Sequence, residues 1–104
     1  MTAKWVPTTN LAMLRRMGKT IEELSELSSV CARCIIQGID EIDPATGKTN
    51  RERLHEEMAD VQAQIAANTI DLNMDQEMMA LRTARKFRLM TDWEAQFKES
   101  GHGN

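Results

Sequence analysis

The stretch IEELSELSSVCARCI, residues 21–35, decides the expected fold class. Its apolar and small residues recur at helical spacing and form one stripe, made of Ile21, Leu24, Leu27, Ser28, Cys31 and Ile35. Three acidic residues, Glu22, Glu23 and Glu26, fall beside this stripe. We therefore expect a helix that ends near Gln37, because Gly38 offers the glycine that commonly follows a helix C-terminus.

Helical patterns continue on the N-terminal side of this stretch. A short helix is expected from Leu11 to about Met17, with Asn10 or Thr9 as its N-cap. Gly18 either breaks this helix or lies inside a helix that runs on into the next one. Both alternatives keep the N-terminal third of the chain helical.

The C-terminal side predicts a long loop and two more helices. Residues 39–50 contain turn chemistry at Asp43-Pro44 and Thr46-Gly47. A third helix, capped by Asn50, is expected from Arg51 to about Leu72, and a last one from Asp75 or Asn73 to about Phe97. The apolar stripe of the third helix comprises Leu54, Met58, Val61, Ile65 and Leu72. The fold class is therefore all-α, with about four helices.

Composition limits the function classes. A chain of 104 residues with 41% hydrophobic and 28% charged residues is expected to form a single globular domain over residues 1–104. Its formal charge of -3 argues against a nucleic-acid partner. No apolar run predicts a membrane span, and no signal peptide is visible, so we expect a cytoplasmic protein. Small helical domains often complete their cores by self-association, which favours a homodimer or homotetramer.

Two acidic motifs carry the chemistry. The first is Glu22-Glu23-Leu24-Ser25-Glu26, and the second is Glu57-Met58-Ala59-Asp60. Residues three apart project from one face of a helix, so Glu23 points with Glu26, and Glu57 with Asp60. If the two helices pack antiparallel, four carboxylates converge. Such a group repels itself unless a divalent cation binds, and oxygen ligands suit Mg²⁺ or Mn²⁺.

Alternative interpretations of these acids stand beside the metal site. Acid-rich helix faces are commonly just solvated, and the chain would then be a non-enzymatic helical adaptor. A redox bundle with two iron ions draws a Glu-x-x-His pair from each of two helices, and it is disfavoured because only one such pair, Glu52 with His55, falls within an expected helix. The Gly18-Lys19-Thr20 and Gly47-Lys48-Thr49 runs lack the earlier glycine of a P-loop. Cys31 and Cys34 are expected to be buried or half-buried free thiols.

The ordered pair of motifs, E-E-x-x-E and then E-x-x-D on a later helix, resembles the MazG-like all-α nucleoside triphosphate pyrophosphohydrolases. The resemblance spans about Leu11 to Trp93 and implies an oligomeric four-helix bundle. It also implies that Mg²⁺ binds the paired acids, and that water attacks the α-phosphate of an NTP or dNTP to give a monophosphate and pyrophosphate. The metal ligands implied in this chain are Glu23, Glu26, Glu57 and Asp60.

The same resemblance implies further site residues. Glu22 would be an additional ligand or would orient the water, beside Glu23 in the catalytic group. Lys86, helped by Arg82 or Arg85, would meet the phosphates from the last helix. Asn10 is a candidate contact for the base or sugar, and Lys19 could touch a phosphate as a point charge.

Loop residues extend the resemblance toward one subgroup. The thirty residues between Glu26 and Glu57 make a longer spacer than the family usually has, and the loop at 38–50 accounts for the excess. The runs at 35–40 and 47–51 look like phage members of the family that act on purine nucleotides, including dGTP. This loop could reshape the substrate pocket.

Overall fold

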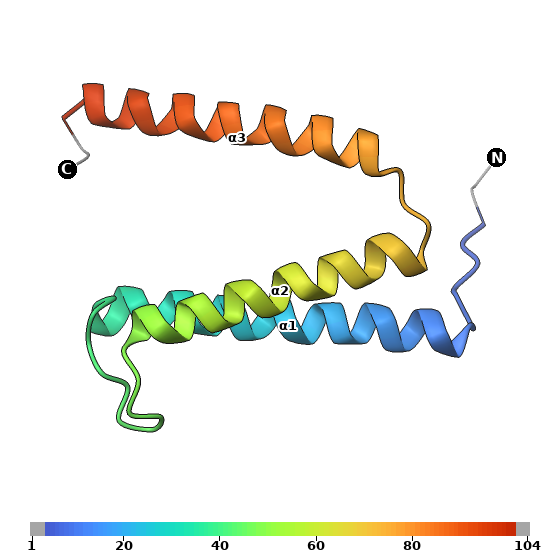
Figure 1. The fold of residues 1–104 in the computed structure, drawn as a ribbon, viewed down its shortest axis with the longest axis horizontal. Coiled ribbons are helices and arrows are strands. Elements are labelled where there is room, and N and C mark those ends of the chain that lie inside the picture. Colours follow the sequence, from blue (N-terminus) through green and yellow to red (C-terminus); the bar gives the residue numbers. More distant parts are fainter. Residues whose placement is uncertain (1–3, 102–104) are drawn as a thin grey trace. The chain divides into compact units, whose positions relative to one another are not determined.

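The computed structural model describes residues 4–101. Within that part of the chain there are three α-helices, α1 (Leu11–Gln37), α2 (Asn50–Asp71) and α3 (Gln76–Glu99), and no strand beyond one isolated bridge between Ile42 and Thr49 (Figure 1). The expected all-α class is confirmed. None of these helices is long and apolar enough to cross a membrane.

Helix α1 accounts for the difference between the three helices observed and the four expected. It begins after Asn10, whose side chain accepts a hydrogen bond from Met13 N at 3.0 Å, and it continues through Gly18. A glycine inside a helix costs only about 1 kcal/mol relative to alanine, so the helical residues on both sides outweigh it. Gly38 ends the helix with φ 101°, as the sequence predicts.

The chain separates into two compact units, residues 1–68 and residues 69–104. In the first unit α1 and α2 lie side by side and antiparallel (Figure 1). Asn68 Nδ2 donates to Thr20 Oγ1 at 2.8 Å near one end of the pair. At the other end Asn50 Nδ2 donates to Gln37 Oε1 at 3.0 Å. Polar contacts therefore fix the register of the two helices at both ends.

Residues 38–49 form a closed hairpin. Asp43 N donates to Lys48 O, and Gly47 N donates to Asp43 O, both at 2.8 Å. The N-cap of α2 is Thr49, and not Asn50 as expected, because Thr49 Oγ1 accepts from Glu52 N at 3.1 Å. Asn50 is completely buried, and its amide nitrogen donates to the first helix and to Gly38 O instead.

The face that α1 turns toward α2 differs from the expected one. Most of the expected stripe stays exposed: Ile21 is 64%, Leu24 50% and Ile35 85% exposed. The buried residues of the helix are Glu23 and Val30, with Leu27 and Cys34 half-buried. In α2, Leu54 and Val61 are half-buried as expected, whereas Met58 and Ile65 are exposed. Leu72, which was expected in this helix, follows its last residue and is half-buried. The pairing of α1 with α2 therefore buries both polar and apolar residues. Each of the two helices covers only one face of the other.

The second unit holds the end of α2, a turn and α3. Asn73 adopts a left-handed conformation with φ 50°, which confirms the expected end of α2 near this residue. Asp75 caps α3 by accepting from Met78 N at 2.9 Å, and this confirms one of the two expected starts. No described residue of α3 is buried.

Candidate metal centre

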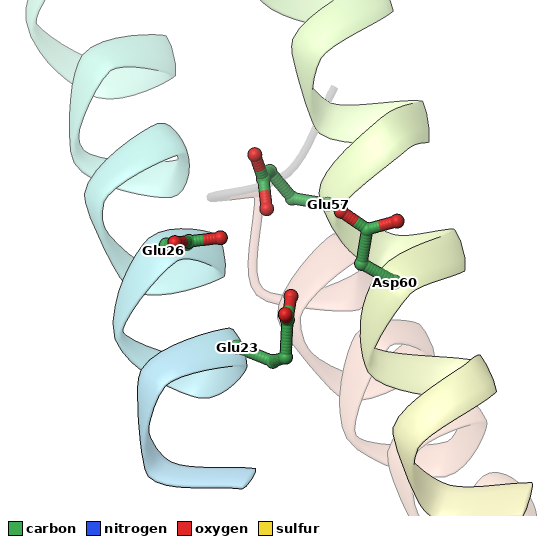
Figure 2. A group of neighbouring side chains, drawn as sticks. All are labelled: Glu23, Glu26, Glu57 and Asp60. Atoms are coloured by element: carbon green, nitrogen blue, oxygen red, sulfur yellow. The ribbon is translucent and has the colours of Figure 1, made fainter. Parts of the chain in front are cut away.

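Four carboxylates from two helices converge in the first unit (Figure 2). Glu23 and Glu26 lie one turn apart on α1, and Glu57 and Asp60 lie one turn apart on α2. Each residue offers an oxygen that lies within 4.8 Å of the oxygens offered by the others. The structure thus brings together the four residues that the sequence analysis selects as metal ligands, and they are called the acid cluster below.

Burial distinguishes the members of the acid cluster. Glu23 is 9% exposed and Glu57 is 7% exposed, whereas Glu26 and Asp60 are exposed. The Oε2 atoms of Glu23 and Glu57 are buried and have no hydrogen-bond partner. Burying a carboxylate oxygen without a hydrogen-bond partner destabilises the fold, because the oxygen loses its hydration and gains nothing in return. A positively charged ligand would therefore stabilise the acid cluster.

Among the described residues, two basic side chains contact the acid cluster. Lys19 Nζ lies 3.2 Å from Glu23 Oε1 and 3.2 Å from Glu22 Oε1. Arg53 Nη2 lies 3.3 Å from Glu57 Oε1. Lys19 is shared with an acid that is not one of the four, so these two cations leave the cluster short of neutralising charge.

The pKa values of two residues in this region are raised. Loss of hydration and then the charges of Glu23, Glu57 and Glu22 raise the pKa of Glu26 above its ordinary value. Hydrogen bonds to Glu22 and then Glu23 raise the pKa of Lys19. The surroundings therefore oppose ionisation of the Glu26 carboxyl group and favour the cationic form of Lys19.

The donor set fits a hard divalent cation. Four carboxylates supply only oxygen, which Mg²⁺ and Mn²⁺ prefer. Cys31 and Cys34 are free and do not belong to this group. Cys34 is half-buried as expected, but Cys31 is exposed.

The other residues selected from the sequence take separate places. Asn10 caps α1, and Lys19 is paired with acids as described above. The carboxylate of Glu22 meets Lys19 and is not one of the four that converge. Arg82, Arg85 and Lys86 are exposed on α3 in the second unit, where Arg82 and Lys86 line a hollow of about 400 Å³ with Phe87.

Two arginines near the acid cluster, Arg53 and Arg33, were not among the predicted site residues. Arg53 precedes Glu57 by four residues, which is the spacing of a helical ion pair, so this contact could have been predicted. Arg33 contacts Asp43 of the hairpin, with 3.5 Å between Nη1 and Oδ1. That contact joins α1 to the loop, and no periodicity in the sequence signals it.

Comparison with other proteins finds no match to a protein family, to a curated protein or to a solved structure. The geometry of the acid cluster and the sequence motifs that form it therefore carry the case for a function.

Proposed function

We propose that this protein is a divalent-metal-dependent nucleoside triphosphate pyrophosphohydrolase of the MazG-like type. The reaction cleaves a nucleoside triphosphate at the α-phosphate and releases a nucleoside monophosphate and pyrophosphate. The substrate proposed is a purine nucleotide such as dGTP, because the loop runs at 35–40 and 47–51 resemble family members that act on purines.

One observation carries the proposal, namely the convergence of four carboxylates whose two buried members each leave an oxygen without a partner. Solvated surface acids would spread apart in water, because like charges at this distance repel. In this chain the backbone of two long helices holds them together. Glu23, Glu26, Glu57 and Asp60 would bind Mg²⁺ or Mn²⁺.

The chemistry divides between the metal and the side chains. A divalent cation bound by the acid cluster would polarise a phosphoryl oxygen and lower the pKa of a water molecule. Glu23 and Glu57 would hold it through the oxygens that lack partners. We propose that Glu22 orients the attacking water, and that Lys19 neutralises a phosphate charge once its carboxylate partners bind metal. Arg82, Arg85 and Lys86 are proposed as phosphate contacts, and Asn10 as a base or sugar contact.

An oligomeric four-helix bundle, a homodimer or homotetramer, belongs to the same proposal. Val30 is the only buried hydrophobic residue in the described part of the chain. The exposed apolar residues of α1 include Ile21, Leu24, Ile35 and Ile36. Exposed apolar residues of a helix are stabilised when a second copy covers them. That residues 1–104 form a single domain remains a prediction.

The proposal is tested by product analysis of the full chain. The protein is incubated with Mg²⁺ or Mn²⁺ and each common NTP and dNTP in turn, and the nucleotides and pyrophosphate are measured. Monophosphate and pyrophosphate are expected in equal amounts, with a purine substrate preferred. Diphosphate and orthophosphate as products, or no turnover, would contradict the proposed reaction.

A matched pair of variants links the activity to the acid cluster. Glu57→Gln removes a carboxylate of the cluster, and Glu56→Gln removes its neighbour, which pairs with Lys48 at 2.9 Å on the surface. We expect Glu57→Gln to lose activity and Glu56→Gln to retain it. Equal activity in the two variants would show that the hydrolysis does not depend on the cluster.

A helical adaptor without enzymatic activity is the second candidate, and the exposed apolar residues of α1 favour it because they offer a surface for another protein. The two functions differ in their response to metal. An enzyme of the proposed type is stabilised by Mg²⁺ or Mn²⁺ through mass action. An adaptor gains no thermal stability from either ion, and Asp60→Asn does not alter its behaviour.

A further inference from the structure

A cavity of about 310 Å³ opens beside the acid cluster, between α1 and α2. Its lining consists of Glu26, Ser29, Val30, Arg33, Arg53 and Glu57. Glu26 and Glu57 belong to the acid cluster, so the cavity adjoins the candidate metal centre directly. The remaining polar lining is two guanidinium groups and a hydroxyl group. A ligand in this cavity would therefore meet metal-binding carboxylates on one side and arginines on another.

Each arginine of the cavity is held by a carboxylate that is itself fixed. Arg53 Nη2 lies 3.3 Å from Glu57 Oε1. Arg33 Nη1 lies 3.5 Å from Oδ1 of Asp43, which is only 3% exposed. The same Asp43 Oδ1 accepts a hydrogen bond from Ala45 N at 3.1 Å. The hairpin thus holds the partner of Arg33 in place.

The two guanidinium groups keep donors for a ligand. A guanidinium carries five N–H donors, and a single carboxylate contact leaves most of them free to bind. The side chain of Arg33 is 47% exposed and that of Arg53 is 28% exposed, so a ligand can reach both. Paired N–H groups of arginine match the oxygens of phosphate closely. The described lining contains no aromatic residue, so it does not suit a nucleobase.

We propose that Arg33 and Arg53 form a phosphate subsite in this cavity, and that Asp43 of the hairpin positions Arg33 in it. The proposal rests on the proposed function, since it assigns the phosphate chain of the nucleotide, or the pyrophosphate released from it, to a defined place. Arg33 and Arg53 would contact the phosphate oxygens. Asp43 touches no substrate and acts through Arg33.

This proposal assigns a role to the loop that lengthens the spacer between Glu26 and Glu57. Asp43 is supplied by the hairpin at 38–49, and the hairpin closes through backbone bonds such as Asp43 N to Lys48 O at 2.8 Å. Without the hairpin, Arg33 would lose the carboxylate that restricts its rotamers, and ordering a long flexible side chain on binding costs affinity. The extra loop residues therefore serve the phosphate end of the substrate.

The experiment uses inorganic pyrophosphate as the probe, with the full chain and saturating Mn²⁺, in isothermal titration calorimetry. Arg33→Gln and Arg53→Gln are compared with Arg15→Gln. Arg15 lies eighteen residues before Arg33 on α1, which is five helical turns and about 27 Å away on the same face. The control thus carries the same substitution on the same helix, outside the cavity.

We expect Arg33→Gln and Arg53→Gln to weaken pyrophosphate binding about tenfold or more, because each removes charge-assisted hydrogen bonds. Arg15→Gln should bind pyrophosphate like the parent. Mn²⁺ binding alone should be at least as tight in all three variants as in the parent, since every acidic ligand is retained. Pyrophosphate affinity that is unchanged in both cavity variants, or absent in the parent, would overturn the subsite.

The positioning role of Asp43 needs its own readout. In Asp43→Ser the hydroxyl can still accept from Ala45 N and preserve the turn, but the negative charge that holds Arg33 is lost. We expect weaker pyrophosphate binding with an unchanged helical content. The double variant Asp43→Ser/Arg33→Gln should bind no more weakly than Arg33→Gln alone. Additive losses in the double variant would overturn the positioning role.

The outcomes separate this subsite from the proposed enzyme activity. Hydrolysis of nucleotides with unchanged kcat and KM in Arg33→Gln and Arg53→Gln would overturn the subsite and leave the proposed function standing. Arginine-dependent pyrophosphate binding by a protein that hydrolyses no nucleotide would support the subsite and contradict the proposed function. If the parent binds no Mn²⁺, the titration is repeated in EDTA, and the arginine dependence of pyrophosphate binding decides the subsite alone.

Discussion

Within residues 4–101, polar residues are buried at the hairpin and in the acid cluster, and the two regions differ in how fully these residues are hydrogen-bonded. At the hairpin, Asp43 accepts from Ala45 N and contacts Arg33, and Asn50 donates two hydrogen bonds through its amide nitrogen. In the acid cluster, Glu23 and Glu57 are buried to a similar degree, yet each leaves a carboxylate oxygen without a partner.

The difference separates residues that hold the fold together from residues suited to a ligand. Asn50 also leaves its Oδ1 without a partner, but a neutral amide oxygen is much less costly to bury than a charged carboxylate. Convergence of four like charges adds repulsion that the hairpin does not have. A protein tolerates such an arrangement when a ligand that stabilises it also confers function. Four experiments test whether the buried acids and the hairpin residues differ in this way.

The largest effect is expected for activity in Glu23→Gln. Glutamine keeps the shape of the side chain but removes a negative charge and half of its metal-binding capacity. Nucleotide hydrolysis should fall by about 100-fold or more, which corresponds to about 2.7 kcal/mol of lost transition-state stabilisation. Product formation is measured together with circular dichroism, which should show an intact helical fold. Turnover close to that of the parent would show that the acid cluster takes no part in the reaction.

Metal should stabilise the protein only through the acid cluster. Free Mn²⁺ at 100 times its Kd is expected to add about 2.7 kcal/mol to the free energy of unfolding, because it binds the folded state alone. Asp60→Asn should lose most of this gain, whereas Glu41→Gln on the hairpin should keep it. Thermal melts with and without EDTA measure the effect. A gain that persists in Asp60→Asn would place the bound ion elsewhere.

Removal of a residue that holds the hairpin should affect stability without regard to metal. Asn50→Ala deletes hydrogen bonds to Gln37 Oε1 at 3.0 Å and to Gly38 O at 2.9 Å, and leaves a buried gap. We expect a loss of about 2 kcal/mol in the free energy of unfolding. Urea denaturation measures it, and the stabilisation by Mn²⁺ should remain. A variant as stable as the parent would mean that the hairpin does not depend on this contact.

The smallest effect concerns pH and Glu26. Its pKa is raised in the folded protein, first by loss of hydration and then by Glu23 and Glu57. The folded state therefore binds this proton more tightly than the unfolded state, and ionisation of Glu26 destabilises the metal-free fold. The destabilisation is absent below the ordinary pKa of glutamate and complete above the raised pKa. The stability contributed by Glu26 should fall as the pH rises through that window.

Glu26→Gln isolates the contribution of Glu26 to the pH dependence of stability. Asp40 and Glu56 contribute in the opposite direction, because Arg51 and Lys48 respectively lower their pKa values. In EDTA the variant should be slightly more stable than the parent at neutral pH, and the two should converge in acid. Melting temperatures across the pH range provide the measurement. An equal difference at every pH would exclude a charge effect at Glu26.

Local sequence rules predicted much of the helical structure. Asn10 and Asp75 cap α1 and α3, and Gly38 and Asn73 mark the ends of α1 and α2, since these residue types favour those backbone conformations. The same rules left Gly18 undecided, because the cost of a glycine within a helix is small. They also missed Thr49 as the cap of α2.

The face of α1 that packs on α2 was beyond a stripe-based prediction. Ile21 and Leu24 give the stronger hydrophobic signal, yet the pair buries Glu23 and Val30. Periodicity locates an apolar face, but it cannot say which neighbour will cover that face. The exposed apolar residues of α1 match the proposed oligomer, in which a second copy would cover them.

Capping, turn chemistry and a three-residue helical spacing are local properties, so the all-α class, most helix ends and the identity of the four acids follow from the sequence alone. Two features depend on tertiary structure: an oxygen of each of the four carboxylates lies within 4.8 Å of the others, and Arg33 contacts Asp43. These contacts join residues far apart in the chain. Their geometry depends on the register of two antiparallel helices, which the polar contacts at their ends fix.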